Sequence, residues 1–137
     1  MLCEILLLSL YMRFNEGDIV YTTCTGMPIC YHVGIIIYDN GQPMVYNNTP
    51  KLKNIVGGNI LAQPLDDFFK DRKLINTIPS NVCPDDVRQY SDDMAHHTWD
   101  ALQYNCEDYV NEIVNGRRYS ELRQTWMLGG LLAWLIF

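Results

Sequence analysis

The sequence has few basic residues and no cluster of them. Its 137 residues include 10 Lys and Arg against 16 Asp and Glu, which gives a net charge of −6 and a pI of about 4.8. Nucleic acids and anionic lipid surfaces are bound through clustered positive charge. The composition therefore excludes a nucleic-acid partner and argues against electrostatic docking on a membrane.

The sequence also lacks a predominantly apolar run of the length that crosses a bilayer. The apolar C-terminal segment, Trp126–Phe137, would be about 18 Å long as a helix, against about 30 Å of hydrocarbon. Residues 2–12 are apolar too, but no basic residue precedes Arg13, as a secretory signal would require. We therefore expect residues 2–12 to pack on the core as a helix or strand.

No pair of cysteines has the CxxC spacing of a zinc or redox site. Cys24 and Cys30 have five residues between them, which is not a usual zinc-ligand spacing either. An odd number of cysteines without such pairs favours free thiols and a reducing, cytoplasmic location, with no metal and no cofactor. The five cysteines are Cys3, Cys24, Cys30, Cys83 and Cys106.

The hydrophobic pattern predicts short strands first and helices last, which is typical of an α+β domain. A β-branched run at Tyr31–Tyr38 is the strongest strand signal, and the turn residues 39–43 lead back into a hairpin partner at Met44–Asn47. At 137 residues the chain is long enough for one domain with a core of its own. Further strands are expected at Ile19–Tyr21, near Ile55–Val56, at Ile60–Gln63 and at Leu74–Ile78, and helices at Leu65–Phe69, from Pro84 and from Cys106.

The segment Asn105–Val110 is typical of the first turn of an amphipathic helix. Asn105 is a good N-cap, Asp108 stands where a capping box would place an acid, and Gly116 is a natural stop. Cys106 then occupies the first helical position, where backbone N–H groups and the helix dipole favour a thiolate. Because neighbouring carboxylates oppose that effect, a nucleophilic Cys106 needs an adjacent base. We expect it to be the most reactive thiol of the chain.

Three histidines are candidates for that base. His96 and His97 stand among acids on the polar side of a helix, where a solvated surface is the simpler interpretation. His32 opens a strongly apolar strand, where a surface histidine is unexpected. On the returning strand, Asn47 could orient the His32 ring as the third member of a triad, with Tyr46 and Asn48 as alternatives.

These residues match the pattern of a known family. The order Gly17-Asp18-Ile19-Val20, His32-Val33-Gly34-Ile35 and Asn105-Cys106-Glu107-Asp108 resembles the lecithin:retinol acyltransferase-like proteins, the "NC" branch of the NlpC-type cysteine enzymes. The resemblance runs from about residue 14 to residue 122. It implies a circularly permuted papain-like fold, with a small antiparallel sheet packed against helices. It also implies that Cys106 is the nucleophile, His32 the base and Asn47 the orienting residue, although family members mostly carry histidine at the position of Asn47.

Three functions are compatible with this pattern. The first is acyl transfer or hydrolysis through a thioester on Cys106, with a lipid ester as the acyl donor that the resemblance favours. The second is a cysteine peptidase or amidase that uses the same residues on a peptide-like bond. The third is an interaction module that keeps the fold without turnover. An apolar groove near Cys106 would favour acyl chains, and a polar cleft would favour peptides.

The C-terminal segment Trp126–Phe137 has two interpretations. It either packs on the domain as a helix, or dips into a membrane with Trp126 and Trp134 at the interface. Gly129-Gly130 weakens a helix meant only for packing, which favours membrane contact.

Overall fold

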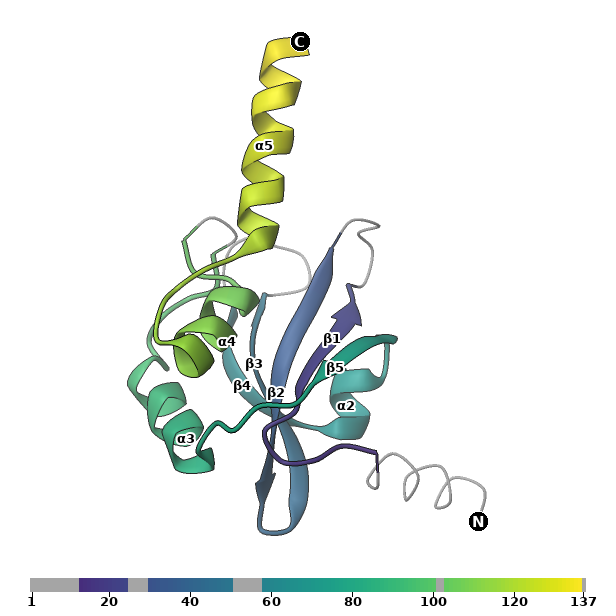
Figure 1. Ribbon diagram of the computed structural model, residues 1–137, viewed down its shortest axis with the longest axis vertical. Coiled ribbons are helices and arrows are strands. Elements are labelled where there is room, and N and C mark those ends of the chain that lie inside the picture. The colour runs from purple at the N-terminus through teal and green to yellow at the C-terminus, as the bar shows by residue number, and fades with distance from the viewer. Residues whose placement is uncertain (1–12, 25–29, 51–57, 101–102, 137) are drawn as a thin grey trace.

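A five-stranded antiparallel sheet forms the centre of the protein and carries helices on both faces (Figure 1). The computed structural model describes residues 13–24, 30–50, 58–100 and 103–136. This architecture confirms the α+β class, with a small antiparallel sheet packed against helices. The strands, in the sheet order β4-β3-β2-β1-β5, are β1 (Ile19–Thr23), β2 (Tyr31–Asp39), β3 (Gln42–Pro50), β4 (Gly58–Pro64) and β5 (Leu74–Ile78), and the helices are α2 (Leu65–Phe69), α3 (Pro84–Asp93), α4 (Cys106–Asn115) and α5 (Glu121–Ile136).

The β2–β3 hairpin is the part of the sheet that local sequence specifies most directly. Its two turn residues, Asn40 and Gly41, have φ values of 53° and 78°, in the left-handed region that asparagine and glycine tolerate best. Pairing then runs from Asp39 and Gln42 to Ile35 and Tyr46. Beyond that point β2 continues to pair with β1, and β3 continues to pair with β4.

Alternate residues of β2 face two separate hydrophobic cores. Val33, Ile35 and Ile37 point toward α3 and α4, whereas Ile36 points toward α2. All four side chains are fully buried, which confirms that both faces of this strand are covered. His32 falls on the α2 side, where its ring centroid lies 5.8 Å from that of Phe68.

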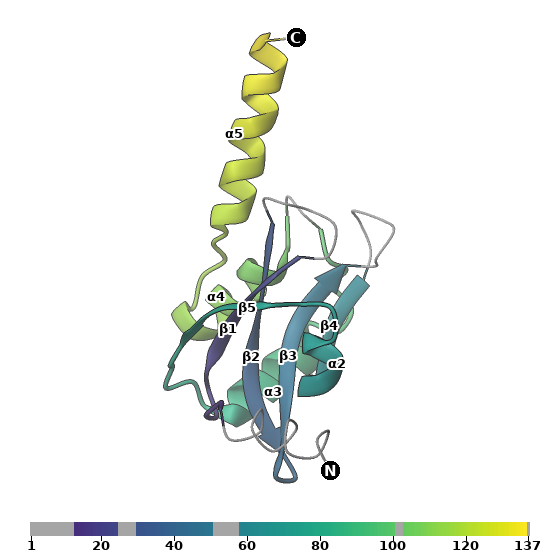
Figure 2. The same cartoon turned by 90° about the vertical axis from the view of Figure 1, so that its right-hand side faces the viewer.

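The last strand, β5, lies at the edge of the sheet opposite to β4, the strand that precedes it in the chain. β5 follows α2 in the chain but pairs with β1, with Ile78 opposite Ile19 (Figure 2). The strand itself is confirmed, while the sequence pattern left its partner open. The segments 2–12 and Ile55–Val56, for which we predicted core packing and a strand, lie outside the described residues.

The prediction of free thiols is wrong for two of the cysteines. Cys24, just after β1, and Cys30, just before β2, form a disulfide, with their Cα atoms 5.4 Å apart. The spacing argument considered short-range motifs only, whereas the antiparallel pairing of β1 with β2 is what brings these two residues together. Of the cysteines in the described ranges, Cys83 and Cys106 are free.

The C-terminal helix α5 begins earlier than its apolar segment and leaves the body of the domain. Its first turn is anchored by Leu122, which is buried, and Trp126 packs partly on the core of α3 and α4. Beyond these residues α5 projects outward (Figures 1 and 2), with Met127 60% and Leu128 63% exposed. Among the residues of α5 whose side chains the structure describes, which end at residue 130, packing on the domain is therefore confined to the start of the helix. No helix among the described residues is long and apolar enough to cross a membrane.

Candidate functional site

Helix α4 begins as the sequence predicts. The Asn105 side-chain oxygen accepts hydrogen bonds from the backbone N–H groups of Glu107 (3.0 Å) and Asp108 (3.2 Å). The Asp108 carboxylate in turn accepts the Asn105 backbone N–H at 3.0 Å, which completes a capping box. Gly116 ends the helix with a left-handed φ of 73°. Cys106 consequently occupies the first helical position.

The two acids after Cys106 have structural partners that the sequence did not indicate. Glu107 accepts hydrogen bonds from the Tyr31 hydroxyl (2.7 Å), the Ser120 hydroxyl (3.0 Å) and the Leu122 backbone N–H (2.8 Å). It therefore ties the first residue of β2 and the start of α5 to α4. Asp108 is fully buried and forms an ion pair of 2.6 Å with Arg123 of α5. Removing either carboxylate would leave buried donors unpaired, which costs about 1–3 kcal/mol for each group.

The Cys106 thiol is buried and protonated at neutral pH. Its side chain belongs to the core between the sheet and α4, and the residue is 3% exposed. Burial raises the pKa of Cys106 to about 12, and the charge of Glu107 adds to that effect. The backbone N–H groups of Val33, Glu107 and Cys106 itself oppose it without compensating for the lost solvent. The helix start alone does not make this thiol a thiolate.

His32 and Asn47 form the pair that the sequence suggested. The His32 Nε2 atom lies 2.9 Å from the Asn47 side-chain oxygen, and both residues are buried. The Asn47 amide nitrogen donates to the carbonyl of Val45 and to the Gln63 side-chain oxygen, both at 3.1 Å. These acceptors fix the orientation of the amide, so the Asn47 oxygen must face the ring and Nε2 must carry the proton. Nδ1 is then the basic nitrogen of the neutral imidazole.

The alternatives to Asn47 have other partners. The Tyr46 hydroxyl donates to Asp39 at 2.6 Å, at the turn end of the hairpin. The Asn48 amide donates to the carbonyls of Tyr104 (3.2 Å) and Asn105 (3.4 Å), just before Cys106. Of these three residues, Asn47 is the one that the structure brings to His32, and its catalytic role stays a prediction.

Cys106 lies against β2 at Val33, the residue that follows His32. The thiol lies against the backbone N–H of that residue. On β3, the Asn48 amide donates to the carbonyls of Tyr104 and Asn105, in the loop that leads to Cys106. Among the described residues, however, no hydrogen bond joins the Cys106 sulfur to the His32 ring. Cys106 belongs to the core on the α4 side of the sheet, whereas His32 falls on the α2 side, so the pairing of Cys106 with His32 stays a prediction.

Arg72 is a charged neighbour that sequence reasoning missed. Its guanidinium donates to the Phe68 carbonyl at 3.2 Å and lies over the Phe68 ring, with Cζ 5.0 Å from the centroid. Burial lowers the pKa of His32 to about 4, and the charge of Arg72 contributes in the same direction. Burial lowers the pKa of Arg72, and the negative charge of an ionised Cys106 would oppose that shift. No motif marks this arginine, which reaches the site only through the fold.

The remaining histidines are exposed. His96 and His97 follow the end of α3, where they are open to solvent, as the simpler interpretation of their sequence context predicts. Within the described ranges, no group of three or more His, Cys, Asp and Glu side chains is arranged to hold a metal ion.

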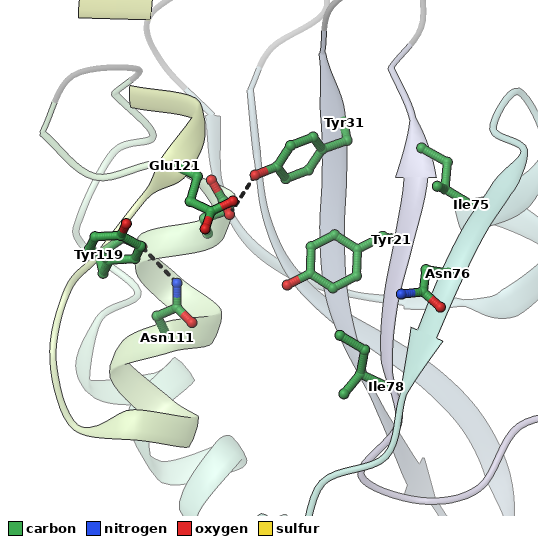
Figure 3. A pocket seen from close by; sticks show the side chains of 9 residues that line it. Tyr21, Tyr31, Ile75, Asn76, Ile78, Asn111, Tyr119 and Glu121 are labelled. Atoms are coloured by element: carbon green, nitrogen blue, oxygen red, sulfur yellow. Dashed lines mark hydrogen bonds between the residues drawn. The ribbon is translucent and has the colours of Figure 1, made fainter. Parts of the chain in front are cut away.

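A pocket of about 390 Å³ lies between the outer edge of the sheet and α4. Tyr21 and Tyr31 project from the sheet toward Asn111 and Tyr119 on the opposite wall (Figure 3). It is lined by Tyr21, Tyr31, Ile75, Asn76, Ile78, Glu107, Asn111, Tyr119 and Glu121, which combine apolar, amide and acidic side chains.

Comparisons of this chain with known protein families, with curated proteins and with solved structures found no match. What the structure defines is a small α+β protein with a buried cysteine at the first position of a capped helix and a hydrogen-bonded histidine–asparagine pair on two neighbouring strands.

The buried, neutral His32 predicts a loss of stability in acid. Its pKa is about 4 in the folded state, against about 6.5 in an unfolded chain, so between these values the unfolded state binds more protons. The free energy of unfolding should therefore fall by about 3 kcal/mol from this group as the pH drops from above 6.5 to 4.

Urea unfolding at pH 7, 5.5 and 4.5 measures this effect. His32→Gln should remove that part of the pH dependence, while the exposed His96→Gln should leave it unchanged. Identical pH profiles for the wild type and His32→Gln would show that the buried ring does not titrate in this way.

Proposed function

We propose that the protein is a cysteine-dependent acyltransferase or hydrolase of the circularly permuted papain-like type. Cys106 is the nucleophile, His32 the base and Asn47 the group that orients His32. The observation that carries the proposal is the His32–Asn47 pair, because the network around the Asn47 amide leaves the basic nitrogen Nδ1 free for a proton from Cys106.

In this mechanism the proton moves only as the thiol attacks. His32 Nδ1 takes the thiol proton while Sγ adds to the acyl carbonyl, and the backbone N–H of Cys106 at the start of α4 is suited to stabilise the resulting oxyanion. The intermediate collapses to a thioester, and the alcohol or amine leaves with the proton from His32. Water or an amine, deprotonated by His32, then attacks the thioester. The acyl group is released, and Cys106 recovers its proton.

Such a general-base route suits a site whose resting groups are both neutral. A pre-formed ion pair would require a cysteine pKa below that of the histidine, whereas here the order is reversed, at about 12 against about 4. The positive charge of Arg72 favours an anionic sulfur but disfavours the imidazolium that forms when His32 takes the proton, which is a further reason for a proton transfer that occurs only as the thiol attacks.

A lipid ester is the proposed acyl donor, supported by the apolar helix α5. The exposed Met127 and Leu128 give its outer part a surface suited to the interface of a bilayer, and Trp126 stands at its base. A peptide-like amide is the second candidate, favoured by the mixed polar lining of the pocket beside Glu107. A binding module without turnover is the third, favoured by the buried thiol that has no hydrogen bond to His32.

Intact-mass analysis after incubation with a donor panel tests these proposals. A mixed phospholipid panel should add a fatty acyl mass to the wild type and none to Cys106→Ala. A panel of acyl-peptide amides and esters provides the second arm. An adduct from the second arm alone would identify the peptidase or amidase, and no adduct with either panel would contradict an acyl-enzyme.

Deleting residues 127–137 tests the proposed membrane contact of α5. The deletion keeps Leu122 and Trp126, which pack on the domain, so the melting temperature should stay within about 2 °C of the full chain. Co-sedimentation with phosphatidylcholine vesicles should be lost. Because the chain is acidic, binding of the full-length protein should be insensitive to salt.

A point variant separates apolar insertion from nonspecific effects of the deletion. Leu128→Asp places a charge on the exposed part of α5 and should weaken vesicle binding with no change in melting temperature. A full-length protein that stays in the supernatant, or a deletion that melts far lower, would contradict membrane contact.

A further inference from the structure

The pocket beside α4 is lined by residues other than Cys106 and His32, and their side chains suit a different kind of ligand contact. Its volume of about 390 Å³ falls in the lower part of the usual range for small-molecule sites, roughly 300–1,000 Å³. Strands β1, β2 and β5, the N-terminal part of α4, the loop before α5 and the start of α5 supply its walls (Figure 3). Cys106 does not line it, although the adjacent Glu107 does.

Two aromatic rings form one wall. The rings of Tyr21 and Tyr31 have centroids 5.7 Å apart and are tilted by 58°, so they present two faces at an angle rather than a flat stack. Ile75 and Ile78, which are 59% and 42% exposed, extend the apolar surface along β5. Angled aromatic faces of this kind are favourable surroundings for an organic cation.

The charges in the lining are all negative. Glu107 and Glu121 are the two ionisable carboxyl groups, and none of the nine lining residues is a lysine or an arginine. Glu107 uses both oxygens in internal hydrogen bonds, so it contributes mainly through its charge, whereas Glu121 is exposed at the start of α5. The nearest guanidinium with a contact to the lining is that of Arg117, 5.8 Å from the Tyr119 ring on the far wall.

The pKa values of the two tyrosine hydroxyls reflect the same negative charge. Burial raises the pKa of Tyr21, and the charges of Glu107 and Glu121 raise it further. Tyr31 is shifted in the same direction by burial, by its hydrogen bond to Glu107 and by both carboxylates. A cation placed at these rings would therefore be attracted by the charges of Glu107 and Glu121.

We infer that this pocket binds a positively charged organic group, an alkylammonium or guanidinium ion. Tyr21 and Tyr31 would contact it through their ring faces, and Glu121 through its carboxylate. This inference deepens the proposed function, because a substrate held by its cationic end beside Glu107 would carry its reactive bond toward Cys106. The binding itself requires no chemistry, and it can be tested when Cys106 is absent.

The test uses the full-length Cys106→Ala protein, so that binding is measured independently of turnover. n-Butylammonium is titrated against ¹⁵N-labelled protein, with n-butanol as its neutral isostere. Amide shifts should appear at Tyr21, Tyr31 and Asn111 with the cation, and at least about 5-fold more weakly with the alcohol. Raising the salt concentration should weaken the binding of the cation only.

Three variants test which residues bind the cation. Glu121→Gln and Tyr21→Leu should each lower the affinity for n-butylammonium by about 3- to 10-fold, because they remove a charge and an aromatic face. Asp66→Asn, which removes an exposed charge on α2 at the opposite face of the sheet, is the matched control and should change nothing.

Equal binding of the alcohol, or affinity unchanged in both Glu121→Gln and Tyr21→Leu, would overturn the inference. Because the protein tested has no Cys106, cation binding with no acyl adduct in the wild type would leave the pocket in place and reject only the proposed chemistry.

Discussion

Replacing His32 by alanine is expected to lower the rate of acyl-adduct formation on Cys106 by at least about 100-fold. A positioned general base contributes roughly 10²–10⁴-fold, and the Cys106 thiol has little thiolate of its own at neutral pH, because burial raises its pKa to about 12. The rate is measured by intact mass over time, with the donor that labels the wild type.

Two matched variants make the result specific to His32. His96→Ala changes an exposed histidine and should leave the rate unchanged. Asn47→Ala should reduce the rate by a smaller factor than His32→Ala, because it removes the group that orients the ring but keeps the base. Equal losses from His32→Ala and His96→Ala, with all variants folded, would point to another base.

Iodoacetamide should label Cys83 at least about 100-fold faster than Cys106 in the folded protein. Cys83 is exposed, whereas Cys106 is buried, and its raised pKa lowers its thiolate fraction at pH 7.5 by about a thousandfold. This expectation reverses the one from sequence, which placed the most reactive thiol at the start of the helix. Peptide mapping after short exposure gives the two rates.

The unfolded protein is the internal control, since both thiols should then react at similar rates. In the folded protein, the labelling of Cys106 should continue to rise with pH up to at least about pH 11, with no plateau near 8.5. Labelling of Cys106 as fast as that of Cys83 at neutral pH would show that the thiol and His32 already share an ion pair at rest.

The sequence by itself determined the local structure around Cys106. Asn105, Asp108 and Gly116 set the start and the end of α4, because capping groups lie within four residues of the backbone groups that they satisfy. The hairpin was equally predictable, since Asn40-Gly41 suits the left-handed turn between two apolar strands. Such features depend on neighbours in the chain, which a sequence displays directly.

Contacts between distant segments were decided by the tertiary structure alone. Asn47, rather than Tyr46 or Asn48, meets His32 because the register of β3 puts it on the same side of the sheet. The side of β2 that a residue faces alternates along the strand, so a shift of one position would have exchanged these roles. Arg72 and Gln63 reach the site only through the positions of α2 and β4.

Burial decided the charge states of the site, and burial is a property of the whole fold. The sequence placed Cys106 at a helix start, where the dipole favours a thiolate, and it placed His32 on an apolar strand. Only the packing of α4 against the sheet showed that loss of solvent outweighs the dipole at Cys106 and lowers the pKa of His32. The sequence thus determined which groups are candidates for the chemistry, while the tertiary structure decided their protonation and their partners, because desolvation depends on every element that surrounds them.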